Sequence, residues 1–489
     1  MAKTKIKFGK EPIYDARQLG APKMVVLGFQ HMFAMFGATV TVPLLTGLSI
    51  STTLLFAGLG TLLFHLLTKF KVPAFLGSSF AFLGGYFAVI AMGAEKGLDV
   101  KQSLPYACLG VACAGVLYIV LSLLIKLAGI NKVMKLFPPV VTGPIIIAIG
   151  LGLAGSAVTN CQTNWIIAIV ALILIVLFNI FGKGMVKIIP ILLGLLGAVA
   201  VAAVLAVTVG APFVDAETGA EYIAINGNAN MLLFDSAKLQ ALKDAAWIGN
   251  PIDWSSTVFG GVSDKGLATS AIIAIVPIAI ATMMEHIGDI SAISATTNRN
   301  FIQDPGLNRT LLGDGLATIF ASLFGAPANT TYGENTGVLA LSKVFDARVV
   351  RIAAYFAILF SFSPKFAALI NLIPTAVIGG ISFVLYGMIS AVGVRNIVEA
   401  KVDFSKARNT IVAAVILVCA LGISAGISFN VGTTTITLSG LAIASIAGIL
   451  LNAIFPEKDF DPSKAFQADT VTAQINTESD YGKKKADAE

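Results

Sequence analysis

The chain has 489 residues, of which 56% are hydrophobic and 12% are charged. A soluble domain carries about 25% charged residues, so this composition excludes an ordinary soluble enzyme or a nucleic-acid-binding domain. Apolar runs of about 20 residues recur along the chain, and each is long enough to cross the hydrocarbon core of a bilayer. The net charge of +6 lies in the loops and tails between these runs, where it reflects orientation in the membrane.

Hydropathy and breaker residues divide the chain into about fourteen apolar spans. The expected spans are 24–46, 51–69, 76–92, 104–128, 139–156, 164–181, 188–209, 266–289, 310–325, 332–344, 350–370, 373–392, 409–428 and 434–455. Two of them, 76–92 and 332–344, are short and are interrupted by Gly, Ser, Thr and Asn. The predicted fold class is therefore an all-α polytopic membrane protein. No nucleophile, phosphate-binding or metal-ligand pattern indicates an enzyme, and no cofactor is expected.

Lysines and arginines gather in alternate loops of this predicted topology. With the N-terminus in the cytoplasm, every expected inner loop is basic, whereas the long outer loop 210–265 holds seven acidic residues against three lysines. An even number of spans with both termini inside satisfies the positive-inside rule. We therefore expect a multi-pass protein of the plasma (inner) membrane, with cytoplasmic tails at 1–23 and 456–489.

Two stretches echo each other across the halves of the chain. LFPPVVTGPIIIAIGLGLAG begins at Leu136, and LIPTAVIGGISFVLYGMISA begins at Leu372. Upstream of each lies one interrupted segment, PAFLGSSFAFLGG from Pro73 and PANTTYGENTGVL from Pro327. Seven spans in each half would make the repeats inverted. Interrupted segments at corresponding positions of two halves indicate a transporter binding site, although Gly and Ser can also simply allow close helix packing.

Ionisable side chains inside the spans are few, and such residues are functional candidates by default because they are costly in a membrane. Glu285 and Asp289 are four residues apart, which places both carboxylates on one helix face. Glu334 lies in the second interrupted segment. Asp314 and His31 are the other candidates for proton coupling.

Structural roles stay open for several of these groups. Asp289 can serve as a helix-terminal or structural hydrogen-bond partner. Asp314 can stand at a cytoplasmic helix start, where an acidic residue favours the helix dipole. His31 can bond a neighbouring helix, and for His65 and His286 a structural or interfacial role is expected.

The buried carboxylates favour an uncharged, flat ligand with N–H groups. A carboxylate accepts hydrogen bonds from adjacent donors, and a free backbone amide donates to a carbonyl oxygen. Uracil and xanthine both present alternating N–H and C=O edges. A carboxylate that meets the two sides of the membrane in turn can also take up a proton on one side and release it on the other. No lysine or arginine lies deep in the spans, which argues against an anion as the substrate.

At these residues the chain resembles the nucleobase–ascorbate (nucleobase–cation symporter-2) transporter family, most closely its bacterial uracil:proton symporters. The resemblance covers nearly the whole chain. The matching stretches are QHMFAMFGATVTVPLL (30–45), VPAFLGSSFAF (72–82), EHIGD (285–289), APANTTYGENTGVLALSKV (326–344) and YGMIS followed by GVRNIVEAKVDF (386–404).

The resemblance implies fourteen segments in two inverted seven-segment repeats, with short β-strands in segments three and ten. It implies an elevator mechanism, in which a core domain slides past a gate domain within a homodimer formed by gate contacts. The expected domains are a core of 24–135 (segments 1–4) and 266–371 (segments 8–11), a gate of 136–209 (segments 5–7) and 372–455 (segments 12–14), and the extracellular loop 210–265.

Carried over residue by residue, the resemblance implies a pocket between segments 3, 8 and 10. Glu285 and Glu334 would bind the pyrimidine ring, and Phe80 and Ser79 would lie at the pocket wall. The remaining expected contacts are Tyr332 and Gly333 beside the ligand, with the amides of Gly333 and Glu334 as donors, and Tyr386 on the gate side.

Two markers of substrate choice disagree within this resemblance. Uracil symporters often have histidine at the position of Asp289, whereas purine-specific relatives often have aspartate there. Those purine relatives typically carry glutamine in place of Glu334, and this chain keeps the glutamate. A uracil:proton symporter is therefore the predicted function, with a xanthine or other purine symporter as the alternative. An anion transporter of the same fold is a third reading, and it requires a cation in segment three or ten.

Overall fold

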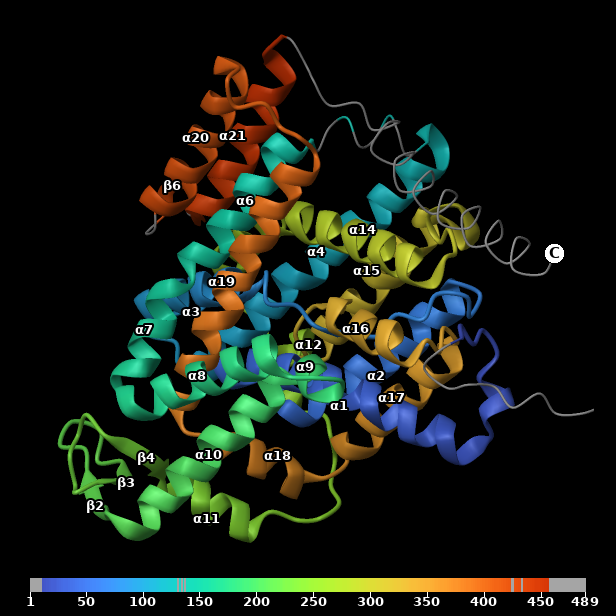
Figure 1. Cartoon of the computed structure of the whole chain (residues 1–489). Coiled ribbons are helices and arrows are strands. Elements are labelled where there is room, and N and C mark those ends of the chain that lie inside the picture. Colours follow the sequence, from blue (N-terminus) through green and yellow to red (C-terminus); the bar gives the residue numbers. More distant parts are fainter. Residues whose placement is uncertain are drawn as a thin grey trace, which may run out of the picture.

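The computed structural model describes residues 11–129, 132, 135, 138–423, 426–431 and 434–456, and for 334, 431 and 434–437 it describes the backbone alone. Of the predicted tails, residues 1–10 and 457–489 lie outside the described residues. The described chain is mostly helical (Figure 1), which confirms the predicted fold class.

Among the described residues before the long connection that starts near 209, one short strand lies among the helices. Its elements are η1 (Ala16–Leu19), α1 (Ala21–Thr46), α2 (Ile50–Leu67), β1 (Leu76–Ser78), α3 (Leu83–Glu95), α4 (Val100–Ala128), α6 (Pro139–Gly152), α7 (Ala154–Gln162), α8 (Trp165–Phe181), α9 (Met185–Ile188) and α10 (Pro190–Thr208).

The second half begins with a folded connection and continues with helices, one short strand and, near its end, a pair of strands. The connection contains β2 (Gly210–Val214), β3 (Glu221–Ile225), β4 (Leu232–Asp235), α11 (Ser236–Asp244), η2 (Trp254–Ser256) and α12 (Val258–Gly261). The helices and strands that follow are α13 (Lys265–Ile275), α14 (Ile278–Thr297), η3 (Ile302–Gly306), α15 (Leu307–Leu323), β5 (Asn329–Thr331), α16 (Gly333–Ser342), α17 (Ala347–Ser361), α18 (Pro364–Asn371), α19 (Thr375–Glu399), α20 (Ala407–Gly422), β6 (Ile427–Val431), β7 (Thr434–Leu438) and α21 (Gly440–Ile454).

Among the described residues, seven helices are long and apolar enough to cross a membrane, or eight if the bent pair α17 and α18 counts as one span. The apolar helices α3, α8, α20 and α21 are shorter. The chain is thus a multi-pass membrane protein by its helices, while the count of fourteen segments stays a prediction.

Three predicted spans differ from the observed elements. The expected span 350–370 is two helices that meet at 89°, because Ser363 caps α18 and Pro364 occupies its first turn. The expected spans 409–428 and 434–455 both include strand residues, since α20 ends at Gly422 and β6 and β7 form an antiparallel pair. The β-branched run that makes up most of β7 favours an extended backbone over a helix.

The two interrupted segments cross at their strands. β1 and β5 pair antiparallel, with Leu76 opposite Thr331, Gly77 opposite Thr330 and Ser78 opposite Asn329. Each strand is followed by a helix, α3 or α16. The expectation of short strands in segments three and ten is confirmed. The pairing satisfies backbone groups that neither helix can satisfy within the membrane.

Helix packing divides the described helices into two groups. In the first helix group, α15 packs along α4 and α2, and α17 packs along α2 and α1. In the second helix group, α19 packs along α6, α7 and α8, and α20 packs along α21 and α6. Figure 1 shows α7, α8 and α19 on one side of the molecule and α2, α16 and α17 on the other.

The first helix, α1, defines two ends of the molecule. Its 26 residues span about 39 Å at 1.5 Å per residue. Near its first residue, the N-terminal segment pairs with the chain that follows α16, where the amide of Ile13 donates to the carbonyl of Lys343 at 2.8 Å. We call this end the N-terminal face. Beyond its last residue lies the connection 209–264, which we call the strap, and this end is the strap face.

Candidate functional site

The α14 helix presents two carboxylates beside open space. Glu285 and Asp289 are one helical turn apart, and both are half-buried. Gly288 lies between them, is exposed, and would meet nothing within 4 Å if it carried a Cβ. The helical spacing thus brings two acidic groups and a gap onto one face of α14.

The first turn of α16 lies against this face. Gly333 is exposed, and a Cβ placed on it would be 3.4 Å from Oδ1 of Asp289. The N-cap residue Tyr332 makes no side-chain capping bond, so its side chain does not satisfy the first amides of the helix. A helix start of this kind offers N–H donors to a ligand with an exposed oxygen. Glu334 is the second residue of α16, and its side chain lies outside what the structure describes.

The strand crossing holds the two interrupted segments together. The amide of Ser79 donates to the carbonyl of Ala328 at 2.8 Å, and the amide of Tyr332 donates to the carbonyl of Phe75 at 3.0 Å. Ser79 is buried and its hydroxyl has no hydrogen-bond partner among the described residues. Phe80 follows β1, is half-buried, and packs against the main hydrophobic core.

Tyr332 turns its side chain into the crossing. Its hydroxyl donates to the carbonyl of Ser78 at 2.7 Å and accepts from Oγ1 of Thr39 at 3.3 Å. Its ring lies so close to Gly77 that a Cβ there would be 2.6 Å from the ring carbons. The backbone of Tyr332 lies at the start of α16, while its ring packs against β1.

A chain of polar contacts leads from Asp289 into the protein. Oγ1 of Thr331 donates to Oδ2 of Asp289 at 3.2 Å and lies 3.3 Å from Nδ1 of His286. The same Nδ1 lies 3.3 Å from Oδ2 of Asp314, and both side chains are fully buried. Asp314 is in the middle of α15, so the alternative placement at a cytoplasmic helix start was wrong. His286 lies in the interior and contacts this acid.

The remaining predicted residues, which include His31 and Tyr386, lie on helices other than α14. His31 is buried in α1, and Nδ2 of Asn335 on α16 lies 3.2 Å from both its Nδ1 and its carbonyl oxygen. Tyr386 is buried in α19, in the second helix group, as part of the main hydrophobic core. His65 bonds the carbonyl of Ala74 through Nε2 at 2.9 Å, in keeping with the expected structural role.

A cavity of about 530 Å³ borders the start of α16 between the two helix groups. Its lining from the first group includes Ala34 and Gly37 of α1 and Gly333 and Gly337 of α16. Its lining from the second group includes residues 187–192 of α9 and α10. The lining also includes Ala340 and Leu341 near the end of α16, so the cavity extends toward the N-terminal face.

Three polar residues of the site were not singled out as site residues by sequence reasoning. Thr331 and Asn335 bond Asp289 and His31, and His286 contacts Asp314. The signal for the first two is their presence in the polar run that begins at Asn329. Their partners lie in distant spans, which the sequence does not pair. Among the described residues no group of three or more His, Cys, Asp or Glu side chains is placed to hold a metal ion.

Comparison with known sequences matches most of the chain to transporters. The Permease family profile matches residues 22–429. The uracil permease of Bacillus caldolyticus is 39% identical over 432 residues, which cover 88% of this chain and 92% of that protein. The uracil permease of Bacillus subtilis is 36% identical over 485 residues, covering 96% of this chain and 99% of that protein. The uracil permease of Escherichia coli is 36% identical over 446 residues, covering 88% and 91%.

Comparison with solved structures shows the fold. The transmembrane domain of the cyanobacterial bicarbonate transporter BicA matches with a TM-score of 0.58 at 15% identity, over 90% of this chain and 99% of that chain. The transporter SLC26A9 matches with a TM-score of 0.57 at 13% identity, over 90% of this chain and 66% of that chain. The predicted inverted-repeat transporter fold is therefore confirmed.

Proposed function

Because the chain belongs to the Permease family, we propose that it imports uracil together with protons. The observation that carries the proposal is the meeting of the Glu285–Asp289 face of α14 with the exposed first turn of α16 beside a cavity. The membership confirms the resemblance found in the sequence, and it makes the chain a membrane transporter rather than an enzyme. Uracil as the substrate is supported by the uracil permeases that share 36–39% of its residues.

Recognition in this proposal divides between acceptors and donors. Glu285 and Glu334 accept hydrogen bonds from the ring N–H groups, and the amides of Gly333 and Glu334 donate to a ring carbonyl. The absence of a side-chain cap on α16 supports the second part. Phe80 and Ser79 form the wall beside β1, Tyr332 contributes its main chain, and Tyr386 contacts the ligand from the second helix group.

Proton coupling is proposed for the acids and histidines that border or back this pocket. Asp289 and Glu285 are the groups nearest the open space. Thr331 links Asp289 to His286 and Asp314, a contact chain through which a change of charge at Asp289 alters the buried pair. His31 reaches the same helix α16 through Asn335.

Alternating access is proposed to follow the two helix groups. The first group corresponds to the core domain, 24–135 and 266–371, and the second to the gate domain, 136–209 and 372–455. Movement of the first group past the second would carry α14 and α16 from one side of the membrane to the other, as in an elevator. We further propose that both termini are cytoplasmic, that gate contacts form a homodimer, and that the cavity toward the N-terminal face represents an inward-open state.

A purine symporter is the second candidate, and Asp289 is the residue that favours it. An anion transporter of the kind found among the solved structures fits less well. It needs a cation at the crossing, and neither 76–94 nor 329–342 contains a lysine or arginine.

Uptake of labelled uracil into proteoliposomes tests the proposal. We expect an inward proton gradient to accelerate uptake and excess unlabelled uracil to abolish it, with xanthine competing weakly. An uptake rate that is the same with and without the proton gradient would refute proton coupling. Stronger competition by xanthine than by uracil would assign the purine function instead.

A further inference from the structure

The strap is attached to the second helix group through its sheet. The amide of Leu232 on β4 donates to the carbonyl of Thr163, and Nδ2 of Asn164 donates to the carbonyl of Leu232, at 2.9 and 3.2 Å. Leu233 and Phe234 are buried, and the sheet packs against α10. Buried side chains and hydrogen bonds together make this a firm attachment.

The strap is also attached to the first helix group, but by a different kind of contact. Its main chain bonds the α17–α18 junction, where the amide of Gly249 donates to the carbonyl of Phe362 and the amide of Lys365 donates to the carbonyl of Ala246, both at 2.9 Å. Trp247 and Ile248 between these bonds are 75% and 83% exposed. At residues 246–249 this attachment therefore consists mainly of main-chain hydrogen bonds near water.

A second contact with the first group follows directly. Oγ1 of Thr52, at the start of α2, donates to the carbonyl of Pro251 at 2.8 Å and accepts from the amide of Asp253 at 3.1 Å. One hydroxyl thus holds two points of the strap.

Thr52 is fully buried, and the strap residues that follow also pack on the first group, with Ile252 in an apolar cluster and Trp254 against Phe324. The loosely held part of the strap is therefore residues 246–249, since segments secured by a few hydrogen bonds near water open at lower free energy than packed elements do.

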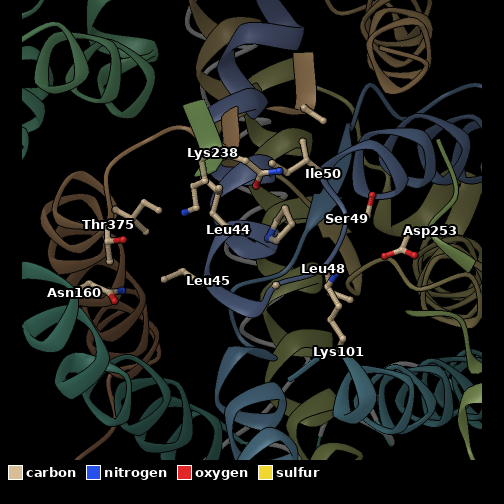
Figure 2. A pocket seen from close by; sticks show the side chains of 15 residues that line it. Leu44, Leu45, Leu48, Ser49, Ile50, Lys101, Asn160, Lys238, Asp253 and Thr375 are labelled. Carbon is tan, nitrogen blue, oxygen red and sulfur yellow. The ribbon is translucent and has the colours of Figure 1, made fainter. Parts of the chain in front are cut away.

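Between its two attachments the strap covers a pocket of about 470 Å³. Lys238 of α11 and Asp253 belong to the strap and line this pocket. Figure 2 shows Asn160 and Thr375, from α7 and α19, on one side of the pocket and Lys101, from α4, with Asp253 on the other. The pocket therefore lies on the boundary between the two helix groups, at the strap face.

The two cavities lie on opposite ends of the same boundary. The cavity beside Gly333 borders the middle of α1 and extends to the N-terminal face, whereas the strap-face pocket borders Pro43–Ile50 at the end of α1. Opening the boundary at the strap face moves the two helix groups relative to each other. Because the strap is bonded to both groups, some of its contacts must then break.

We propose that the strap is a latch on the outer entrance. Its contacts with Phe362 and Lys365 hold while the cavity opens toward the N-terminal face, and they release when the strap-face pocket opens to admit substrate. The sheet stays on the second helix group and residues 252–264 stay on the first, because packed side chains hold both. The contacts at residues 246–249, between these two parts, are the ones that break. The latch rests on the proposed transport function, since it concerns the step that readmits substrate.

Two engineered disulfides distinguish the attachments. The chain's four cysteines are unpaired, so they are first replaced and the resulting protein is shown to retain uptake. The pair Ala246→Cys with Lys365→Cys bridges the strap to the first group, and the pair Thr163→Cys with Leu232→Cys bridges it to the second. Both pairs join residues whose main chains are already hydrogen-bonded at 2.9 Å.

We expect oxidation of the first pair to reduce uracil uptake by at least about 10-fold and reduction to restore it, because the outward opening is blocked. The protein with the second pair should take up uracil equally well when it is oxidised and when it is reduced. Full uptake with the oxidised first pair would overturn the latch, as would loss of uptake with the oxidised second pair. Absence of uracil uptake already in the natural protein would instead refute the proposed substrate.

A labelling experiment tests the latch without any substrate. In the cysteine-free protein, Asn371→Cys places a thiol in the strap-face pocket. Gly249→Val removes the latch, because a Cβ at Gly249 would be 2.6 Å from Cγ of Pro364 and the strap must lift to accommodate it. Modification of the thiol by a membrane-impermeant maleimide should become several-fold faster with Gly249→Val and slower in the oxidised Ala246–Lys365 bridge. Equal rates in all three proteins would contradict the proposal.

Discussion

The two interrupted segments share a backbone plan and differ in chemistry. Each consists of a three-residue strand followed by a helix, and the strands pair with each other. After β1 the chain is mainly apolar, with Phe80 and Phe82 leading into α3, whereas β5 and the start of α16 are polar from Asn329 to Thr336. The pairing supplies one scaffold, and each segment contributes a different surface to it.

The polar side chains of the second segment are mostly directed into the protein. Nδ2 of Asn329 donates to the carbonyl of Phe56, Thr331 bonds Asp289, and Asn335 bonds His31. These contacts fix the segment against three helices of the first group. A site that recognises a ligand by hydrogen bonds needs such a rigid support, because small displacements weaken each bond. The segment around β1 thus provides an apolar wall, and the segment around β5 provides positioned polar groups.

The largest expected effect comes from removing a carboxylate on the polar side. Glu285→Gln or Glu334→Gln should weaken uracil binding by about 10- to 100-fold, since a hydrogen bond to a charged group contributes about 1.5–3 kcal/mol. Equilibrium binding to the purified protein measures the loss. Glu399→Gln, at an exposed glutamate that pairs with Arg395 on α19, is the matched control and should bind normally. Wild-type affinity in both site variants would refute the proposed pocket.

Overfilling the crossing should damage the scaffold that both segments share. Gly77→Ala places a Cβ 2.6 Å from the ring of Tyr332, so we expect a loss of about 1–3 kcal/mol of stability together with reduced uptake. Thermal unfolding in detergent measures the first quantity. Gly84→Ala in α3 is the control, because nothing lies within 4 Å of its Cβ. Equal stability of the two variants would contradict the close crossing.

Removing the apolar wall should cost less than removing a carboxylate. Phe80→Ala leaves the hydrogen-bonding groups in place and deletes a half-buried ring, so uracil affinity should fall by roughly 5- to 30-fold, equivalent to about 1–2 kcal/mol of lost contact. Phe80→Leu retains much of the apolar area and should recover part of the affinity. If the Phe80→Ala and Phe80→Leu variants bind uracil equally well, the Phe80 ring does not form the wall of the pocket.

The smallest change in binding is expected at Asp289. Asp289→Asn should alter the pH dependence of uptake while leaving uracil affinity within about 5-fold, because a neutral amide keeps the bond from Thr331 and loses the titrating group. Thr331→Val should change the pH dependence in the same way but less, since it removes one hydrogen bond to that carboxylate. Initial uptake rates over a range of pH provide the measurement. An unchanged pH dependence in Asp289→Asn would remove this residue from the coupling mechanism.

Much of the fold follows from the sequence because membrane helices carry their signal locally. Apolar length located α1, α2, α4, α8 and α10, and Gly, Ser and Thr marked both interrupted segments. The β6–β7 pair and the bend before α18 were missed, since hydropathy does not distinguish an apolar strand from a helix or reveal a bend within a span. Helical spacing also placed Glu285 and Asp289 on one face.

The partners of those residues could not be predicted in the same way. Thr331 with Asp289, His286 with Asp314, and Asn335 with His31 join spans that are tens to hundreds of residues apart. Such contacts depend on helix rotation and tilt, which a single sequence does not specify. The strap was predicted only as an acidic loop, because several of its attachments are main-chain hydrogen bonds, which leave no residue-type signature.

Proton entry, rather than uracil entry, is the most direct measure of coupled import. Proteoliposomes that contain a pH-sensitive dye and no imposed gradient receive uracil from outside, and internal pH is followed over time. If import is coupled through this site, uracil acidifies the interior with the wild-type protein and Glu285→Gln abolishes the acidification. Uracil entry without any change of internal pH would contradict coupled import through this site.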